Sequence, residues 1–342
     1  MVRKGSAREN ILMLLAMSDG QIKKDICREI CGSEYYYKRV MQRMKEEGSA
    51  ATLFGEKPKM LRIRRRGIEV VKERIPWIEE RYNQGRLNIK KDRIQRQADV
   101  SQVIYNMQLA DVLYCPDEKA SLKPGGMTEE VQDAGLYYTA WELNKSNNDE
   151  TRGSRVCGVL YMRGDMYFLY NMEDRNIKFY KKTEQRLQDS ILLDYPPFNG
   201  RKRPMAIIFG EGYRGMEIIL ENVEREKKFR MMNHNEFYNR LTPEEGYYYV
   251  PNGQKGSLYI RIIRNPQITE NIKKNIQNKL GSEVLMFFPI HLPVLKMLYA
   301  GDRRMNVVCL EDQAEFVKSY FSDKVNLYTL ERNAVERLYE GK

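Results

Sequence analysis

Histidine is nearly absent from this chain of 342 residues, which contains only His234 and His291. A rolling-circle relaxase needs a cluster of metal-binding histidines, and Ser-His-Asp or Cys-His catalysis needs a histidine with a partner beside it. The two histidines are 57 positions apart, and each lies in an apolar or Asn-rich setting. The sequence therefore disfavours all of these catalytic classes.

Cysteine is sparse, and its spacing is irregular. The chain has five cysteines, at positions 27, 31, 115, 157 and 309. An odd, scattered set fits a reducing compartment better than a disulfide framework. Cys27 and Cys31 lie one helical turn apart, as two zinc ligands could, but no second cysteine pair accompanies them. We interpret both as small, partly buried residues near the end of a helix.

Long apolar runs are absent as well. No run reaches the roughly 18 residues that a membrane span needs, and the segment Met1–Gly5 lacks the apolar core of a signal peptide. We therefore expect a cytoplasmic protein with no membrane contact. The chain also lacks the pattern G-x-x-x-x-G-K-[ST], which disfavours a P-loop ATPase.

One glycine motif is present. The stretch Gly210-Glu211-Gly212-Tyr213-Arg214-Gly215 matches G-x-G-x-x-G between an expected strand and an expected helix, which is the context of a dinucleotide site. However, the helix is short, and no clear second strand ends in Asp or Glu about 20 residues further on. We interpret the motif as a flexible strand-to-helix turn, with nucleotide binding as the alternative.

Positive charge is concentrated in the N-terminal part of the chain. Residues 1–95 contain 23 Lys and Arg against 13 Asp and Glu, a net charge of +10, whereas residues 96–342 contain 35 against 34, a net charge of +1. The length allows two or three domains, each with a core of its own. A basic domain can neutralise phosphates and gain affinity by releasing counterions. The N-terminal part is therefore the candidate nucleic-acid-binding domain.

The same part has the element order of a winged helix-turn-helix. The expected elements are a helix around Ile11–Leu15, helices over Gln21–Ile30 and Glu34–Glu47, strands over Ala50–Phe54 and Met60–Arg64, and a helix over Gly67–Arg81 that is kinked or broken near Pro76. Ser33 begins the third helix and Gly48 ends it. The buried stripe that we expect on this helix consists of Tyr37, Val40, Met41 and Met44.

The candidate DNA contacts follow from this arrangement. A recognition helix presents its N-terminal and outward side chains to the major groove. We expect base-edge contacts from Tyr35, Lys38, Arg39 and Gln42, and a backbone contact from Arg43. Contacts to phosphates or to a minor groove are expected from Lys23, Lys24, Lys57, Lys59, Arg62 and Arg64.

Beyond this module, the pattern predicts a linker helix and an α/β domain. We divide the chain into a winged helix-turn-helix domain (1–85), a linker helix (86–115) and an α/β domain with a mixed sheet (116–342). The long helix is expected over Asn88–Tyr114. The expected strands of the last domain are 136–143, 155–162, 166–172, 205–209, 247–250, 284–288, 306–310 and 325–329, and its expected helices are 180–193, 216–223, 268–280 and 313–321.

Two stretches are similar to parts of a known family. The first is the end of the expected wing, Leu61-Arg62-Ile63-Arg64-Arg65-Arg66-Gly67, and the second is the expected hairpin of 154–160 with 167–171. In both, the chain resembles the replication-relaxation family of plasmids and conjugative elements of Gram-positive bacteria. The resemblance covers most of the chain, and it implies a winged helix followed by an α/β domain similar to the PD-(D/E)xK nuclease core.

The hairpin departs from a working nuclease site. Such a site needs Asp on one strand and Glu-x-Lys on the next, so that two carboxylates hold Mg²⁺. The corresponding positions of the two strands are Val156, Cys157 and Gly158, and Phe168, Leu169 and Tyr170. Asp165 lies in the turn, and Glu173, Asp174 and Lys178 follow the second strand with the wrong spacing. We therefore expect a degenerate, non-catalytic core, and we assign no catalytic residue, no metal ligand and no cofactor.

Three functions remain open from the sequence. The leading one is a sequence-selective double-stranded DNA-binding protein that acts in plasmid or mobile-element replication, transfer or transcriptional control. The alternatives are a Mg²⁺-dependent nuclease with a divergent PD-(D/E)xK site and a ligand-responsive transcription regulator. Besides double-stranded DNA, the candidate partners are a second copy of the chain, since DNA sites with two-fold symmetry favour a homodimer, and the replication or transfer machinery.

Overall fold

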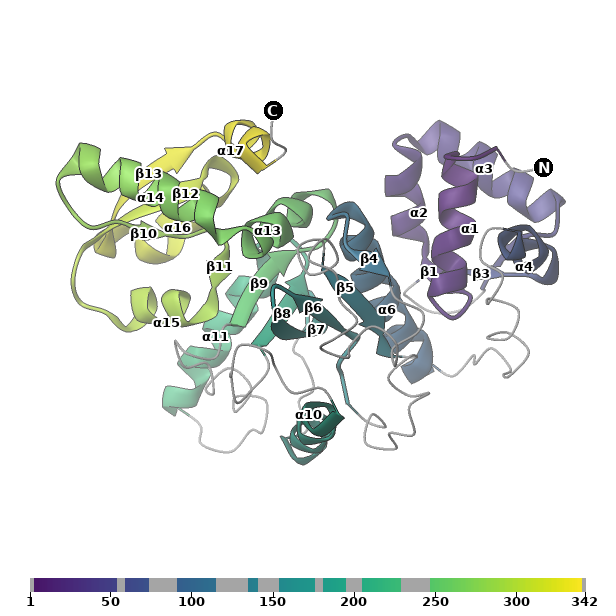
Figure 1. Cartoon of the computed structure of the whole chain (residues 1–342), viewed down its shortest axis with the longest axis horizontal. Helices are drawn as coiled ribbons and strands as arrows, with labels where there is room; N and C mark the ends of the chain where they lie inside the picture. The colour runs from purple at the N-terminus through teal and green to yellow at the C-terminus, as the bar shows by residue number, and fades with distance from the viewer. Residues whose placement is uncertain are drawn as a thin grey trace. The chain divides into compact units, whose positions relative to one another are not determined.

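The chain is a mixed α/β protein (Figure 1). The computed structural model describes residues 3–53, 59–73, 91–114, 135–140, 154–175, 181–194, 205–228 and 247–339, and three β-sheets lie within these ranges. Contacts along the chain define two compact units, unit 1 (Met1–Tyr105) and unit 2 (Asn106–Lys342). The boundary falls inside the helix that we expected to link the two domains.

Unit 1 combines short helices with one small antiparallel sheet. Its elements are α1 (Ala7–Met17), β1 (Gln21–Lys23), α2 (Lys24–Cys31), α3 (Glu34–Glu46), β2 (Ala50–Thr52), β3 (Met60–Ile63), α4 (Arg65–Lys72) and the first part of α6 (Lys91–Leu109). The strand order is β1-β3-β2. Within unit 1, the Gln97 side chain on α6 donates a hydrogen bond to the Ser18 carbonyl after α1.

Local signals set the ends of these helices. The Ser6 and Ser33 hydroxyl oxygens each accept a hydrogen bond from a backbone N–H in the first turn of the following helix, at 3.3 Å, which satisfies a donor that has no partner inside the helix. Gly32 and Gly48 follow α2 and α3 with φ of 70° and 68°, the left-handed conformation that glycine adopts without strain. The predicted start of α3 at Ser33 and its end at Gly48 are thus confirmed.

The core of unit 1 is aliphatic. The side chains that are at most 3% exposed include Ile11, Leu12, Leu15, Ile22, Ile26, Met44, Met60, Leu61 and Ile63. Burying one such side chain contributes about 1.5–3 kcal/mol. Gly67 lets α4 approach this core, because a Cβ there would overlap the Ser49 carbonyl oxygen and lie 2.8 Å from Cγ1 of Ile63.

Several predictions for unit 1 were wrong in detail. Gln21–Lys23 is strand β1 rather than the start of a helix, because Ile22 pairs with Leu61 of β3 and the ladder takes up its backbone groups. β2 ends at Thr52. Arg64 lies after β3 and precedes α4, which therefore begins before Gly67. Met41 is only half-buried. The expected continuation of α4 through Pro76 lies outside the described residues.

Unit 2 is built on a seven-stranded mixed sheet with helices on its faces (Figure 1). The strand order is β11-β9-β8-β7-β6-β5-β4, in which β5, β6 and β7 are antiparallel neighbours and β7, β8 and β9 are parallel. The strands are β4 (Leu113–Tyr114), β5 (Leu136–Thr139), β6 (Gly158–Met162), β7 (Asp165–Glu173), β8 (Met205–Gly210), β9 (Tyr247–Pro251) and β11 (Ile290–His291). The main helices around them are α10 (Lys181–Asp194), α11 (Arg214–Lys228), α13 (Gln254–Arg264) and α15 (Leu292–Ala300).

A second, parallel sheet completes unit 2. It has the order β10-β12-β13, with β10 (Leu285–Met286), β12 (Met305–Leu310) and β13 (Val325–Leu330). The helices of this part are α14 (Pro266–Leu280), α16 (Ala314–Phe321) and α17 (Arg332–Tyr339). Arg332 on α17 connects this part of unit 2 to helix α13. Its guanidinium donates to Asp312 at 3.1 Å and lies 5.6 Å from the centre of the Tyr259 ring on α13.

Tyrosine supplies much of the core of unit 2. The rings of Tyr137, Tyr138, Tyr161, Tyr170, Tyr249 and Tyr259 are among the largest fully buried side chains. Tyr247 and Tyr249 are buried while Tyr248 between them is half-buried, which is the alternation of faces along a strand. The predicted turn after β6 is also confirmed: Arg163 and Gly164 both have positive φ, of 52° and 76°, as a two-residue type I′ hairpin requires.

Other predictions for unit 2 need correction. The long helix ends at Leu109 rather than Tyr114, because Asp111 has a φ of 56° and Leu113–Tyr114 pair with β5. Only Leu285–Met286 of the expected strand 284–288 pair as β10. Helices α13, α15 and α17 were not predicted. In the part of the chain that the structure describes, no helix is both long and apolar enough to cross a membrane.

Candidate nucleic-acid interface

The outward face of α3 carries a group of exposed polar and aromatic side chains. Tyr35 is 72% exposed, which is unusual for a large ring, and the same face exposes Lys38, Arg39, Gln42 and Arg43. On the opposite face, the stripe of Tyr37, Val40 and Met44 is buried against unit 1. Packing thus fixes the rotation of α3 and leaves the five predicted contact residues facing solvent.

The exposed side chains of α3 differ in how firmly they are held. The Arg39 guanidinium lies 5.7 Å from the centre of the Tyr35 ring, a cation–π contact within the first turns of the helix. Lys38 makes only a loose pair with Glu34 at 3.9 Å. Exposed ion pairs of this kind contribute about 0–1 kcal/mol, so a phosphate or a base edge can replace them at little cost.

Carboxylates bind the polar side chains in the C-terminal half of α3. Gln42 donates to Glu46 at 2.8 Å, and Arg43 donates to Glu47 at 3.0 Å. Glu47 also accepts from Arg8 on α1 at 2.5 Å. Burial opposes ionisation of Glu47, but the hydrogen bonds from the two arginines outweigh it and hold the pKa of this carboxyl below its ordinary value. Arg43 is therefore held more firmly than Lys38.

A second basic cluster joins the start of α2 to the strand that precedes α4. The Lys24 backbone N–H donates to the Lys59 carbonyl at 3.0 Å, so the two lysines are held side by side. Burial lowers the pKa of Lys24, and the positive charges of Lys59 and Arg28 lower it further. A bound anion would relieve this repulsion between like charges. The cluster is thus electrostatically prepared for phosphate.

Arg28 connects this cluster to α3 and was not predicted as a site residue. Its guanidinium donates to Asp25 at 2.5 Å, lies 3.5 Å from a Glu34 carboxylate oxygen, and stacks 5.0 Å from the centre of the Tyr37 ring. Its spacing of four residues from Lys24, which places both on one helix face, was the signal in the sequence. Through Arg28 the cationic groups of α2 and α3 become neighbours.

The remaining predicted contacts have different placements. Lys23 is half-buried at the end of β1, and Arg62 is half-buried on β3 opposite Ala51. Arg64 is exposed but lies at the other end of β3 from Lys59, about 16 Å away for five residues of extended chain. Lys57 lies outside the described residues. The structure therefore brings Lys24 and Lys59 together and connects them through Arg28 and Glu34 to Lys38, whereas Arg64 lies at the other end of β3.

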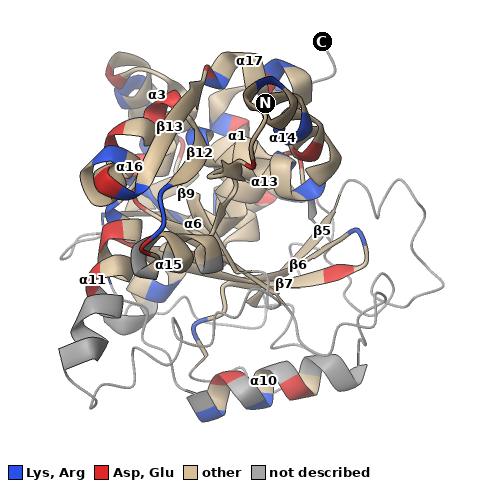
Figure 2. Cartoon of the chain, turned by 90° about the vertical axis from the view of Figure 1, so that its left-hand side faces the viewer, with Lys and Arg blue, Asp and Glu red and all other residues tan. Residues whose placement is uncertain are grey.

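The charge on unit 2 has a different distribution. Lysine and arginine alternate with aspartate and glutamate along α10 and α16 (Figure 2), in keeping with the near balance of 35 basic and 34 acidic residues after residue 95. In the described part of the chain, no group of three or more His, Cys, Asp or Glu side chains could hold a metal ion. The described cysteines 27, 31, 157 and 309 are buried and form no disulfide, and burial raises the pKa of the Cys27 thiol well above its usual range.

Three asparagines meet near the carboxyl ends of the parallel strands of unit 2. Glu173, expected after the second strand, is instead the last residue of β7, where its carboxylate is paired with Arg175 at 2.5 Å. Asn106 on α6 accepts from the Gly253 N–H at 3.0 Å and donates to Asn252 at 2.8 Å, and Asn252 donates to Asn171 on β7 at 3.2 Å. The carboxyl ends of parallel strands are a common place for a ligand site. Neutral amides that already bond to one another make a poor Mg²⁺ site, because this ion favours carboxylate ligands.

The glycine motif before α11 is explained by packing. A Cβ at Gly210 or at Gly215 would overlap the hydroxyl group of Tyr249, and at Gly215 it would lie 2.6 Å from Cε2 of the same ring. The Tyr249 hydroxyl in turn donates to the Gly212 carbonyl at 2.7 Å. The ring of a neighbouring strand thus fills the space beside this turn, where a dinucleotide site would hold its pyrophosphate.

Replacing Gly215 with alanine is expected to lower the free energy of unfolding by about 1–3 kcal/mol, the usual effect of overpacking. The cause is the contact with the Tyr249 ring. Thermal unfolding of the full chain, followed by circular dichroism, measures the change. In a Tyr249→Ala background the added methyl group has room, so the same substitution should have a smaller effect there. An equal loss in both backgrounds would contradict this explanation.

Comparison with known protein families, curated proteins and solved structures finds no match for the chain. The function therefore has to be argued from the residues themselves.

Proposed function

We propose that the chain is a sequence-selective double-stranded DNA-binding protein in which unit 1 acts as a winged helix-turn-helix. The observation that carries the proposal is the exposed face of α3, with Tyr35, Lys38 and Arg39, beside the cluster of Lys24 and Lys59. Nearly the whole excess of positive charge, +10 of +11, belongs to residues 1–95. Aromatic and basic side chains together on one exposed helix suit the major groove.

In this proposal α3 is the recognition helix. Arg39 is positioned to pair with a guanine edge, Lys38 and Gln42 to contact neighbouring bases, and Tyr35 to pack against a thymine methyl or the backbone. Lys24 and Lys59 bind phosphates on one side of the groove and fix the register of the helix. Because the existing pairs of Lys38 and Arg43 are exposed, exchanging them for DNA costs little.

Unit 2 fits a non-catalytic scaffold of the nuclease type. Its order of α6, the antiparallel β5-β6-β7, the connecting helix α10 and the parallel strand β8 is the order of elements in a PD-(D/E)xK core. The asparagines at its strand ends account for a loss of catalysis. Together with unit 1, this order supports a protein of the replication-relaxation type, acting in replication, transfer or transcriptional control of a mobile element, with a homodimer as the expected form on DNA.

Titration of the full chain with duplex DNA at several salt concentrations tests the proposal. Six exposed or half-exposed cations of unit 1, namely Lys24, Lys38, Arg39, Arg43, Lys59 and Arg64, can reach phosphates. If all six do, the logarithm of the association constant should fall with the logarithm of the salt concentration with a slope of about −5. Absence of binding at low salt, or a slope near zero, would refute the proposal.

Two further experiments test the sequence selectivity and the absence of cleavage separately. Selection from a library of random duplexes should enrich one motif, and a failure to enrich any motif would reduce the proposal to unspecific binding. Supercoiled plasmid incubated with the full chain and Mg²⁺ should stay intact. Nicking or linearisation would overturn the non-catalytic role of unit 2 and would favour the divergent nuclease, while leaving DNA binding by unit 1 in place.

A further inference from the structure

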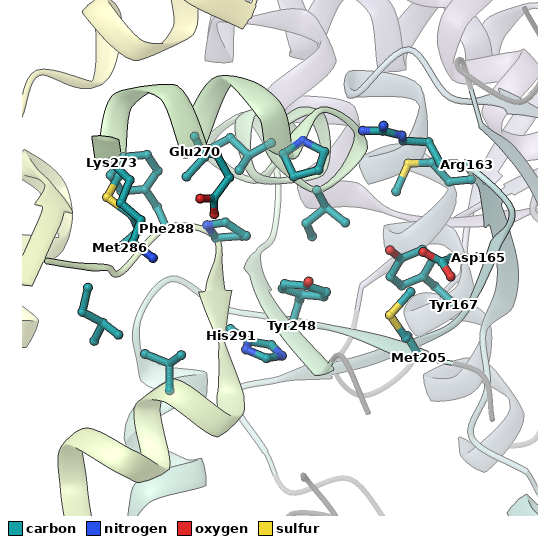
Figure 3. Close-up of a pocket in the computed structure, with 18 residues that line it drawn as sticks. Arg163, Asp165, Tyr167, Met205, Tyr248, Glu270, Lys273, Met286, Phe288 and His291 are labelled. Atoms are coloured by element: carbon teal, nitrogen blue, oxygen red, sulfur yellow. The ribbon is translucent and has the colours of Figure 1, made fainter. Parts of the chain in front are cut away.

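Unit 2 contains a pocket of about 480 Å³ that none of the functions above uses (Figure 3). It lies between the starts of strands β7, β8 and β9 on one side and helix α14 with strand β10 on the other. This is the opposite end of the parallel strands from the asparagines of the candidate nuclease centre. The volume is within the range of about 300–1,000 Å³ that is typical of small-molecule sites.

One side of the pocket is a row of three rings. The centres of Tyr167 and Tyr248 are 6.4 Å apart, and those of Tyr248 and His291 are 5.0 Å apart. The pairing of β11 with β9 places His291 directly beside Tyr248. The opposite walls include Met286 and Phe288 (Figure 3). Flat rings and thioethers bind a planar, polarisable group better than an aliphatic chain.

Polar groups also line this pocket. The Nε2 atom of His291 is buried and has no hydrogen-bond partner among the residues that the structure describes, which is an unusual state for a buried polar atom. Burial lowers the pKa of His291 to about 4, so the imidazole is neutral at physiological pH and can donate or accept one bond. From α14, Glu270 directs its carboxylate into the pocket, and Lys273 lies one turn further along the same wall (Figure 3).

We propose that this pocket binds a small molecule with a nucleobase, a nucleoside or its 5′-monophosphate. The base stacks on Tyr248, its edge bonds to Glu270 and to Nε2 of His291, and a phosphate group reaches Lys273. A base edge offers both N–H donors, which a carboxylate needs, and ring nitrogens. A purely apolar ring would leave the buried Nε2 of His291 without a partner and would make no bond to the exposed Glu270 carboxylate, which selects against it.

The inference does not rest on DNA binding by unit 1. The pocket also differs from the glycine turn at Gly210, which lies at the other end of strand β8 and is filled by Tyr249. A ligand here would contact both sheets of unit 2, since Tyr248 belongs to the large sheet and Met286 to the small one. The chain would then respond to a nucleotide through unit 2.

Isothermal titration of the full chain with the common nucleosides and their 5′-monophosphates tests the inference, with indole as an apolar control. At least one nucleoside or monophosphate should bind with a Kd below about 1 mM, and indole should bind more weakly. If none of the nucleobase compounds binds at that concentration, or if indole binds as tightly, the inference is overturned.

Four variants locate the binding. Tyr248→Leu removes the stacking surface and Glu270→Gln removes the charged acceptor, so each should weaken binding about tenfold. Lys273→Gln should weaken the monophosphate several-fold and leave the nucleoside unchanged, whereas equal effects on both would overturn the phosphate contact. Lys274→Gln, at an exposed neighbouring position outside the pocket lining, is the matched control. Unchanged affinity in Tyr248→Leu, with its melting temperature preserved, would place the ligand elsewhere and overturn the inference.

Discussion

Replacing Arg39 with glutamate is expected to weaken binding of duplex DNA by about 100-fold, or about 2.8 kcal/mol. A bidentate arginine contact to a base contributes about 1–3 kcal/mol of discrimination, and a carboxylate at the same place adds repulsion from the phosphates. Arg39 is exposed on α3, and its one described contact is with the Tyr35 ring. The substitution should therefore leave the fold unchanged, which thermal unfolding verifies.

The control for this prediction has to separate a local contact from a change in net charge. Lys274→Glu lowers the net charge by the same two units, but Lys274 lies on α14 in unit 2. We expect its effect on affinity to stay within about threefold at 150 mM salt, where charges more than about 8 Å from the DNA are screened. Fluorescence anisotropy with the selected duplex measures both variants. Equal losses in the two would show that net charge, and not α3, governs binding.

Arg39→Lys refines the same test. Lysine keeps the charge but loses the planar, two-pronged donor geometry and the stacking on Tyr35. We expect it to retain most of the unspecific affinity while the preference for the selected motif falls. If Arg39→Lys keeps the full preference for the selected motif, Arg39 binds the DNA backbone rather than a base. In that case Lys38 and Gln42 would be the residues that contact the bases.

The second large effect is expected at Glu184 on α10, where replacement by alanine should lower the free energy of unfolding by about 3–5 kcal/mol. Glu184 is only 1% exposed. Its carboxylate accepts from the Ser154 hydroxyl at 2.9 Å, from the Arg155 backbone N–H at 2.8 Å and from the Tyr170 hydroxyl at 3.2 Å. Removing the acceptor leaves these donors without this partner in a buried place.

The raised pKa of Tyr170 agrees with its role as a hydrogen-bond donor to Glu184. Burial, followed by the nearby Glu184 carboxylate, raises the pKa of Tyr170 well above its ordinary value, so this hydroxyl remains a donor at every pH at which the chain is folded. Glu184 thereby joins helix α10 to strand β7 and to the segment that leads into β6. These hydrogen bonds hold α10 in place against the sheet.

Thermal unfolding of three variants measures the effect. Glu184→Gln keeps the size and one acceptor oxygen, so we expect a loss smaller than that of Glu184→Ala. Asp189→Ala lies at an exposed position of the same helix, where substitutions usually change stability by less than about 0.5 kcal/mol. If Glu184→Ala melts at the same temperature as Asp189→Ala, the buried hydrogen bonds do not stabilise unit 2 as argued.

Part of the fold could be predicted because its signals are local. Ser33, the spacing of Tyr37, Val40 and Met44, and Gly48 all act within one or two turns, and the structure confirms α3 with its buried and exposed faces. The turn at Arg163 was predictable for the same reason. Helix α13 was missed because residues 256–260 are buried in an unbroken run, which does not show the single apolar stripe from which the other helices were predicted.

Other predictions failed where distant segments compete for the same residues. Ile22 has helical spacing with Ile26, and both are buried. However, Gln21–Lys23 pair with one edge of β3 and therefore form a strand. Such pairing overrides local propensity, because it satisfies backbone groups and buries side chains at once. The candidate site was predictable to the extent that it lies on α3, and Arg28 was missed because its importance comes from contacts with a second helix.

By itself, the sequence determined the class of the fold, the concentration of positive charge in residues 1–95 and the outward face of α3, because composition, helical period and capping depend on residues close together in the chain. Only the tertiary structure placed Lys24 beside Lys59, joined Asn106, Asn171 and Asn252 near the strand ends, and brought Tyr248, Glu270 and His291 into one pocket. The physical reason is that strands far apart in the sequence can pair in one sheet, and the local sequence pattern does not show which strands will be neighbours.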